Sequence, residues 1–282
     1  MNKKFILNAD DVGISKWHNK AVLESYELGL LKSVSLVANG ESFDEFINEI
    51  IPKCPNIGIG IHLNIMEGIS LCDDVFKLTD SNKKFNNSFL DILIKSYNKN
   101  DKEFFEQLER EFRLQIEKIM SRTSVTHIDS HVHVHSIPPI FDLVCKLANE
   151  YNIKQVRTQC EKLYVVPDLY KHLNKNYFVN IIKNMLLKTF TIKNKLLIEK
   201  YNLSTNHYII GVLYTAMMNS LTLSYGLKAI KNDNVVVEAL IHPCRYEDGT
   251  TDNHFDEFLI TKNNKLKLEI ENLGFEITNY VA

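Results

Sequence analysis

The histidine-rich stretch 126–135 places the strongest constraint on how this chain can fold. It carries four of the chain's ten histidines together with an aspartate. In an extended strand alternate residues face opposite sides, so one face would pack through β-branched residues and the other would carry imidazoles and the carboxylate. A histidine-rich surface strand is the alternative, but β-branched residues favour a buried strand that brings metal ligands into a pocket. The residues expected on the polar face are His127, Asp129, His131, His133 and His135.

The rest of the chain reads as strands that alternate with helices. Short apolar runs predict strands over residues 4–9, 33–38, 57–64, 154–157, 209–214 and 235–241. Helical periodicity lies between them, over residues 15–28, 43–52, 102–120, 138–147, 176–200 and 255–273. We therefore predict an α/β fold, a barrel of parallel strands and helices, in a single domain over residues 1–282. Residues 65–100 and 160–225 read as irregular insertions in it.

Composition narrows the function classes. A formal net charge of −2 and a hydrophobic content of 45% are ordinary for a soluble globular protein and do not suggest a nucleic-acid partner. Five cysteines without a CxxC pair indicate neither a disulfide framework nor a cysteine zinc site, and we expect a reducing cytoplasm. The N-terminal apolar run is too short for a signal peptide, and no later run predicts a membrane span. The basic amphipathic pattern of residues 176–200 predicts a lid or dimer helix rather than a membrane-surface helix.

Polar residues lie at the carboxyl ends of the predicted strands. In a parallel barrel these ends meet on one face, which is where such folds place their chemistry. Segments far apart in the sequence would therefore build one site. One aspartate with two histidines is a common open ligand set for a divalent ion. The strand-end residues are Asp10, Asp11, His62, Asp129, His131, Arg157 and His242.

Four sequence blocks resemble the signature motifs of the YdjC-like carbohydrate deacetylases, a family that includes the chitooligosaccharide deacetylases. They are residues 8–13 (NADDVG), 60–64 (GIHLN), 126–135 (THIDSHVHVH) and 242–243 (HP), in the same order along almost the whole chain. The resemblance implies an irregular (β/α) barrel related to the polysaccharide deacetylases and to TIM barrels. It also implies removal of acetyl groups from N-acetylated mono- or oligosaccharides with a bound divalent metal.

The resemblance further implies a role for each site residue. Asp11, His62 and His131 resemble the metal ligands, Asp10 the catalytic base and His242 the acid. Magnesium is the implied metal, whereas a site with two imidazoles suits Zn²⁺ better than Mg²⁺ on chemical grounds. The family and the high frequency of dimers among soluble proteins lead us to expect a homodimer.

The chemistry of amide hydrolysis suggests how these residues would act. A metal that lowers the pKa of bound water from about 16 toward about 7 supplies a nucleophile at neutral pH. Asp10 would take the water's proton, His242 would protonate the departing amine, and Arg157 would pair with Asp10 and keep it ionised. Two structural alternatives stay open, because Asp10 could simply cap the first helix and Arg157 could be a structural ion pair.

The other polar residues of the histidine-rich stretch are expected to have supporting roles. Asp129 would support His131 by fixing an imidazole tautomer rather than by binding the metal itself. His127, His133 and His135 cannot all be ligands of one three-ligand site, so at least some of them face substrate or pack in the core.

Two rival functions fit parts of the sequence. Barrel phosphoesterases and amidohydrolases also use His-x-His pairs, but there the pair generally ends the first strand, which here ends in Asp10 and Asp11. An inactive sugar-binding barrel would need neither the acid nor the base, whereas both Asp10 and His242 are present. The order and content of the motifs therefore favour a deacetylase.

Overall fold

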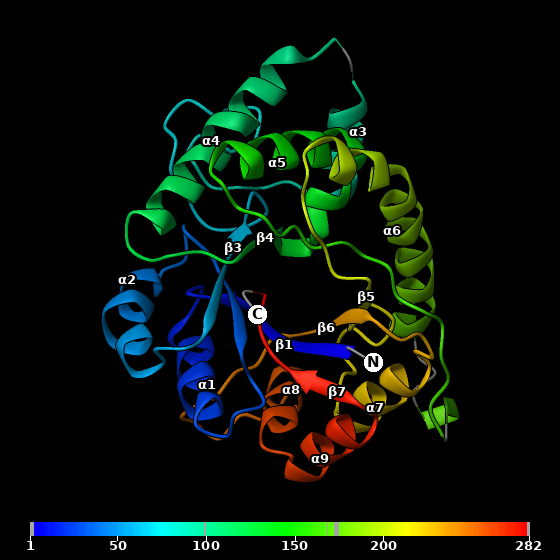
Figure 1. Cartoon of the computed structure of the whole chain (residues 1–282). Helices are drawn as coiled ribbons and strands as arrows, with labels where there is room; N and C mark the ends of the chain where they lie inside the picture. The colour runs from blue at the N-terminus through cyan, green and yellow to red at the C-terminus, as the bar shows by residue number, and fades with distance from the viewer. Residues whose placement is uncertain (1–2, 99, 168, 172–174, 281–282) are drawn as a thin grey trace.

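The chain folds into an irregular (β/α) barrel. The computed structural model describes residues 3–98, 100–167, 169–171 and 175–280. Its strands run parallel in the order β4-β3-β2-β1-β6-β5, and β7 pairs with the start of β1. Figure 1 shows the helices wrapped around the outside of this curled sheet. The strands are β1 Lys3–Val12, β2 Ser33–Leu36, β3 Gly58–Leu63, β4 His127–Ser130, β5 Tyr208–Ile210, β6 Val235–Ile241 and β7 Phe275–Ile277.

The helices fill most of the connections between the strands. The α-helices are α1 Lys16–Tyr26, α2 Phe43–Glu45, α3 Phe89–Tyr97, α4 Lys102–Met120, α5 Pro138–Glu150, α6 Lys175–Lys200, α7 Ser220–Lys228, α8 Asn253–Thr261 and α9 Asn264–Asn272. Shorter helical turns are η1 Phe46–Ile50, η2 Ile51–Lys53, η3 His131–Ser136 and η4 Leu169–Lys171. Among the described residues, none of these helices has both the length and the apolar character needed to cross a membrane.

An irregular segment, residues 154–160, closes the gap between the edge strands β4 and β5. The amide of Ile128 donates to the carbonyl of Gln155 at 3.0 Å, and the amide of Arg157 donates to the carbonyl of Ile128 at 3.1 Å. On the other side the amide of Ile209 donates to the carbonyl of Cys160 at 3.0 Å. The strand predicted over residues 154–157 is thus present only as isolated bridges. These bridges carry Arg157 to the end of the sheet where the polar residues gather.

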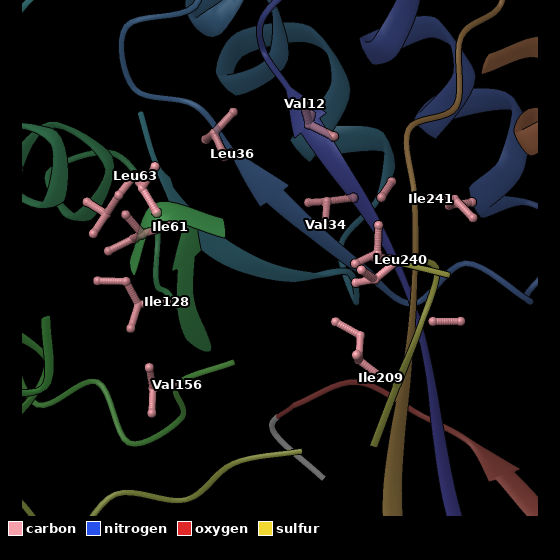
Figure 2. Packing of buried hydrophobic residues seen from close by; sticks show 14 of the residues in the cluster. Val12, Val34, Leu36, Ile61, Leu63, Ile128, Val156, Ile209, Leu240 and Ile241 are labelled. Carbon is pink, nitrogen blue, oxygen red and sulfur yellow. The ribbon is translucent and has the colours of Figure 1, made fainter. Parts of the chain in front are cut away.

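The core lies inside the barrel and beneath the helices. Figure 2 shows apolar residues from neighbouring strands packed together, all of them nearly or fully buried. Such burial supplies most of the stability of a parallel fold, since both faces of its sheet are covered. The labelled residues are Val12, Val34, Leu36, Ile61, Leu63, Ile128, Val156, Ile209, Leu240 and Ile241.

Three predicted elements are interrupted in the structure. The helix predicted over residues 255–273 is two helices, because Asn263 caps α9 by accepting a hydrogen bond from the amide of Leu266. The helix predicted over residues 43–52 changes from α2 to the turns η1 and η2. The strand predicted over residues 209–214 ends at Ile210, because the Glu161 carboxylate binds the next three backbone amides.

The position of Gly60 on β3 requires a glycine, because the side chain of His127 on the neighbouring strand β4 lies close to it. A β-carbon at this position would lie 2.3 Å from the imidazole of His127. That ring cannot move aside easily, because it stacks on Tyr280 with ring centroids 4.2 Å apart and contacts the hydroxyl of Thr126 at 2.8 Å. A glycine at this position thus allows the side chain of the neighbouring strand to approach closely.

We expect Gly60→Ala to lower the free energy of unfolding by about 1–3 kcal/mol, because the added methyl group overpacks a rigid site. Denaturant unfolding measures the change. Gly58→Ala is the matched control on the same strand, since its new β-carbon would meet only Asn279, at 3.1 Å, near the end of the chain. Equal effects of the two substitutions would contradict this account of Gly60.

Candidate metal centre and active site

A β-bulge at the end of β1 turns two consecutive aspartates toward one site. The pairing of β1 with β2 shifts register between Ala9 and Val12. Within the bulge Asp11 has a φ of +61°, a left-handed conformation that aspartate tolerates better than most residues. Neighbouring residues of a regular strand face opposite sides, so this bulge lets both Asp10 and Asp11 contribute to the same site.

His62 and Asp129 lie directly opposite each other on β3 and β4. The Nδ1 atom of His62 is 2.6 Å from Oδ1 of the fully buried Asp129, and its Nε2 atom is 3.2 Å from Oδ1 of Asp11. Asp129 therefore fixes the orientation of His62 and directs Nε2 toward Asp11. The prediction that Asp129 supports His131 is wrong in this respect, because the imidazole within hydrogen-bond distance of Asp129 is that of His62.

His131 reaches the site through a turn and not through an extended strand. β4 ends at Ser130, whose hydroxyl accepts a hydrogen bond from the amide of His135 at 2.9 Å and closes the turn η3. Val132 and His133 have φ values of 52° and 62° inside this turn. The prediction of one polar face over the whole stretch is therefore wrong beyond Asp129. The turn leaves Nδ1 of His131 2.7 Å from Oδ1 of Asp11.

The three other histidines of the stretch stand apart from this cluster. His127 is a buried packing residue between Gly60 and Tyr280. His135 is fully buried, with Nδ1 2.7 Å from the Ser130 hydroxyl and Nε2 3.0 Å from the carbonyl oxygen of Arg157. His133 is also buried, and its Nδ1 has no hydrogen-bond partner within the described part of the chain.

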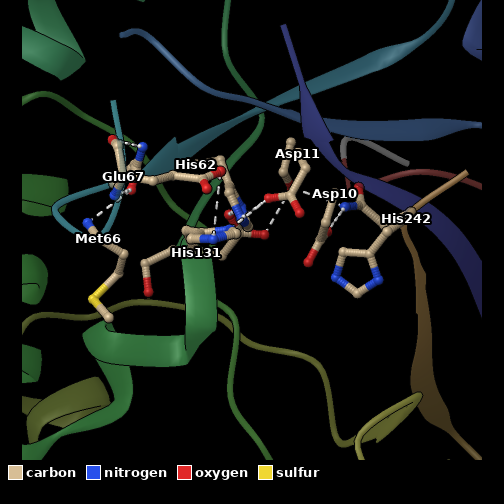
Figure 3. A network of polar contacts seen from close by, with 12 residues as sticks. Asp10, Asp11, His62, Met66, Glu67, His131 and His242 are labelled. Carbon is tan, nitrogen blue, oxygen red and sulfur yellow. Dashed lines mark hydrogen bonds and ion pairs between the residues drawn. The ribbon is translucent and has the colours of Figure 1, made fainter. Parts of the chain in front are cut away.

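Asp11, His62 and His131 together have the geometry of a metal centre. One potential ligand atom from each lies within 4.8 Å of the other two (Figure 3). Burial opposes ionisation of Asp11, yet the two histidines hold its pKa well below the usual range. Burial alone would lower the pKa of His62, but Asp129 and Asp11 outweigh it and raise that pKa to about 10. The carboxylates thus attract positive charge, which a divalent cation would provide in place of the proton.

Arg157 is the permanent cation that holds the buried carboxylates together. It is fully buried and forms a bidentate pair with Asp10, with both N–O distances 2.7 Å. It also contacts Asp129 Oδ2 at 2.7 Å and Glu238 Oε1 at 2.6 Å. The side-chain amide of Asn8 donates a further hydrogen bond of 2.7 Å to Asp10 Oδ1. The predicted pairing of Arg157 with Asp10 is present, and the two residues form a rigid unit beside the metal centre.

The residues Glu238 and Glu257 were missed by the reasoning from sequence. Glu238 lies on β6 and accepts a hydrogen bond from the hydroxyl of Tyr280. Burial raises its pKa to about 7, although Arg157 opposes the rise. A lone charged residue in the apolar run 235–241 was the available signal, because a buried charge needs a partner. Glu257 lies on α8 and gave no such signal.

His242 follows β6 and lies beside Asp10 in the site (Figure 3). Its amide donates to the Glu257 carboxylate, and its Nδ1 is 3.2 Å from the same oxygen. Burial would lower the pKa of His242, but the hydrogen bond and charge of Glu257 raise it to about 9. The Nε2 atom has no hydrogen-bond partner among the described residues, so His242 can give a proton to a group in the site.

An open pocket of about 290 Å³ adjoins the metal centre at the carboxyl ends of the first three strands. Glu67 belongs both to its wall and to the centre, since its Oε1 is 3.8 Å from Nε2 of His131. Five of the eight lining residues have polar side chains, which offer hydrogen bonds to a ligand rich in hydroxyl and amide groups. The lining residues are Ile14, Ser15, Asn39, Gly40, Glu41, Asn64, Glu67 and Gly68.

Comparisons with known proteins identify a family and several similar sequences. The sequence model of the family described as YdjC-like protein matches residues 4–271. The carbohydrate deacetylase of Brevibacillus brevis is 37% identical over 151 residues, which are 53% of this chain and 57% of that protein. The carbohydrate deacetylase of Clostridium beijerinckii is 36% identical over 151 residues, 53% of this chain and 58% of that protein. The matched stretch thus spans little more than half the length of these relatives.

A solved structure shares the fold over almost the whole chain. It is a protein of Enterococcus faecalis V583 that carries a provisional name as a cellobiose-phosphate cleavage protein. The TM-score is 0.75, and the match covers 99% of this chain and 98% of that one. The two sequences are only 20% identical, so the likeness concerns the fold alone.

Proposed function

The chain belongs to the YdjC-like protein family, and from this premise we propose that it is a metal-dependent hydrolase that removes acetyl groups from N-acetylated carbohydrates. The single observation that carries the proposal is the convergence of Asp11, His62 and His131 beside the ion-paired Asp10 and the acid His242. Relatives named carbohydrate deacetylases support the reaction type. Chitooligosaccharides are the substrate class that we propose first.

Asp11, His62 and His131 would hold a divalent ion. The donor set fits such an ion, because a carboxylate oxygen and two imidazole nitrogens lie within 4.8 Å of one another and three protein ligands leave further coordination positions open. When bound, the ion would supply Lewis-acid polarisation of the amide carbonyl and a lowered pKa for water. Family resemblance favours Mg²⁺ and the two imidazoles favour Zn²⁺, so elemental analysis of protein prepared without added metal decides between them.

The proton transfers would be carried out by residues of the chain itself. Asp10 takes a proton from the attacking water while the oxygen of that water forms a bond to the amide carbon. Arg157 holds the orientation of Asp10 through the bidentate pair. His242 then gives a proton to the amide nitrogen as the carbon–nitrogen bond breaks, which releases acetate and a free amine.

The pH dependence should report His242 and its partner. Turnover is expected to fall as the pH rises through about 9, because His242 then loses the proton that the leaving amine needs. Glu257→Gln removes the negative charge that raises this pKa, so the alkaline limb of the kcat profile for acetate release should move to lower pH. Glu269→Gln is the control, since Glu269 pairs with Lys228 away from the site. An unmoved limb in Glu257→Gln would contradict the role of His242.

Metal removal tests the proposal as a whole. Acetate release from N-acetylated chitooligosaccharides should stop after chelation and return when Mg²⁺ or Zn²⁺ is added back to the wild type. His62→Gln, which removes one ligand and leaves Asp10 and His242 in place, should bind less metal and recover no activity. Full acetate release by chelated protein, or release of phosphate from a sugar phosphate without any deacetylation, would overturn the proposal.

We also propose a homodimer formed through α6. Five of its exposed apolar side chains are spaced four, three, seven and four residues apart, which places them on one face, as is typical of a helix packed against a second helix. Leu187 and Phe190 face the barrel instead and are buried. The exposed residues of this stripe are Phe178, Ile182, Met185, Ile192 and Leu196.

Light scattering should give the wild type twice the chain mass of 32.7 kDa. Ile182→Lys should shift the protein toward the monomer, because it places a charge inside the apolar stripe. Leu268→Lys on α9 is a matched control, since Leu268 is 60% exposed but lies outside the stripe. A monomeric wild type would contradict the dimer proposal. The cytoplasmic location stays a prediction that cell fractionation can test.

A further inference from the structure

A second cluster of metal-ligating side chains adjoins the active site. It consists of His18 in the first turn of α1, Cys244 just after β6, and His254 at the start of α8. One potential ligand atom from each lies within 4.8 Å of the other two. The cluster shares no residue with the centre of Asp11, His62 and His131, and the proposed function does not use it.

Hydrogen bonds hold each imidazole of the cluster by one nitrogen and leave the other nitrogen available. Nδ1 of His18 is 2.9 Å from the Ser15 hydroxyl, and Nδ1 of His254 is 2.8 Å from the carbonyl oxygen of His242. Neither Nε2 has a hydrogen-bond partner within the described part of the chain. Metal-binding histidines typically show this arrangement, because the bond at one nitrogen fixes the tautomer and directs the lone pair of the other.

Backbone contacts place the three side chains near one another before any ligand binds. The amide of Cys244 donates to the carbonyl of His254 at 3.1 Å, and the amide of Arg245 donates to the carbonyl of Trp17 at 3.0 Å. The first bond joins Cys244 to His254, and the second joins the residues that are adjacent to Cys244 and His18 in the sequence. Ser15 stands at the N-cap of α1 without capping it, since its hydroxyl is used by His18.

We propose that Nε2 of His18, Sγ of Cys244 and Nε2 of His254 bind a second metal ion, of the Zn²⁺ class. One thiolate and two imidazoles form a soft donor set that favours Zn²⁺ over Mg²⁺, and three protein ligands leave a fourth position open. Binding breaks the S–H bond of Cys244, sends the proton to solvent and forms a sulfur–metal bond. Tetrahedral zinc needs ligand atoms roughly 3.5 Å apart, and the three atoms here already lie within 4.8 Å of one another.

The bound ion would fix the part of the chain that carries the proposed acid. His254 contacts His242 through the carbonyl, and the two imidazole rings lie 6.2 Å apart. An ion held by His18, Cys244 and His254 would join α1 to residues 242–254. His242 would then have a fixed position relative to Asp10, and the two metal sites could have different metal preferences.

Cobalt substitution tests the site directly, because Co²⁺ bound to a thiolate absorbs through a sulfur-to-metal charge-transfer band that oxygen and nitrogen ligands do not give. Reduced full-length wild type titrated with Co²⁺ should show this band and saturate it by two equivalents, one for each metal site. Cys244→Ser should lose the band, and His254→Gln should weaken Co²⁺ binding at this site by at least tenfold. Cys72→Ser and Cys160→Ser are matched controls that should keep the band, since both thiols are partly exposed and lie outside the cluster.

Co²⁺ bound at the centre of Asp11, His62 and His131 must be distinguished from Co²⁺ bound at this cluster. Asp11→Asn with His62→Gln removes two ligands of that centre and should leave the cobalt–thiolate band unchanged. Circular dichroism of Cys244→Ser should show a folded protein. If Cys244→Ser does not fold, the weaker Co²⁺ binding expected for His254→Gln tests the site in its place. The proposal is overturned if the wild type gives no thiolate band, if the band persists in Cys244→Ser, or if it disappears in Cys72→Ser or Cys160→Ser.

Discussion

Replacing Asp10 with asparagine should lower the turnover number for acetate release by about 10²–10⁴-fold, the usual contribution of a general base. The substitution preserves size but removes the group that would take the proton from water. Metal content should change little, because the proposed ligands are Asp11, His62 and His131. The measurement is kcat for deacetylation with the metal content of each preparation determined in parallel.

Asp10 is also a partner of Arg157, so loss of that ion pair must be separated from loss of the base. Glu238→Gln supplies the control, because it removes another carboxylate from the same guanidinium. With its pKa raised to about 7, Glu238 is already partly protonated at neutral pH, so its loss should be mild. Turnover within a few-fold of wild type is expected for Glu238→Gln. Equal losses in both variants would mean that Asp10 acts only through Arg157.

Replacing Arg157 with methionine should lower the free energy of unfolding by about 3–5 kcal/mol, the usual result when one partner of a buried charge network is removed. Asp10, Asp129 and Glu238 would then lie buried without their permanent cation. For a chain of this size the fall in Tm should be roughly 6–20 °C. Thermal and denaturant unfolding measure both quantities.

The pH dependence of this loss has a definite sign. Burial opposes ionisation of Asp129, but Arg157 and His62 hold its pKa well below the ordinary range in the wild type. A lowered carboxyl pKa stabilises the fold above the ordinary pKa of about 4, and that stability is lost as the pH falls through the lowered value. The difference between wild type and Arg157→Met should therefore be largest near neutral pH and shrink in acid.

Arg113→Met is the matched control for Arg157→Met. Arg113 also contacts two carboxylates, those of Glu109 and Glu150, but its side chain is 31% exposed. Surface ion pairs contribute about 0–1 kcal/mol, so this variant should unfold almost like the wild type. If the two arginine variants lost the same stability, the buried network would not have the importance assigned to it.

The barrel and the meeting of the strand-end residues could both be predicted from the sequence, and for the same physical reason. Parallel strands bring their carboxyl ends to one face, so Asp10, His62 and Arg157 could be expected to meet although they are far apart in the chain. The family motifs then assigned expected roles to these positions. The structure brings them together, and their roles remain proposals.

What could not be predicted depends on local backbone geometry and on distant partners. The left-handed turn at Val132 and His133 ends the alternation of polar and apolar faces that a strand would have. The residue types in this stretch do not predict such a turn. Glu257 meets His242 only because α8 packs against β6. The cluster of His18, Cys244 and His254 has no motif spacing, so cysteine counting pointed away from a metal site.

The most direct test of the account is mass spectrometry of N,N′-diacetylchitobiose incubated with the metal-loaded protein, with acetate measured in the same sample. We expect loss of one or both acetyl groups, one acetate for each free amine formed, and an intact glycosidic bond. Asp10→Asn should leave the sugar almost unchanged. An unaltered disaccharide with wild type, across N-acetyl sugars of every length tried and with either metal, would contradict the account.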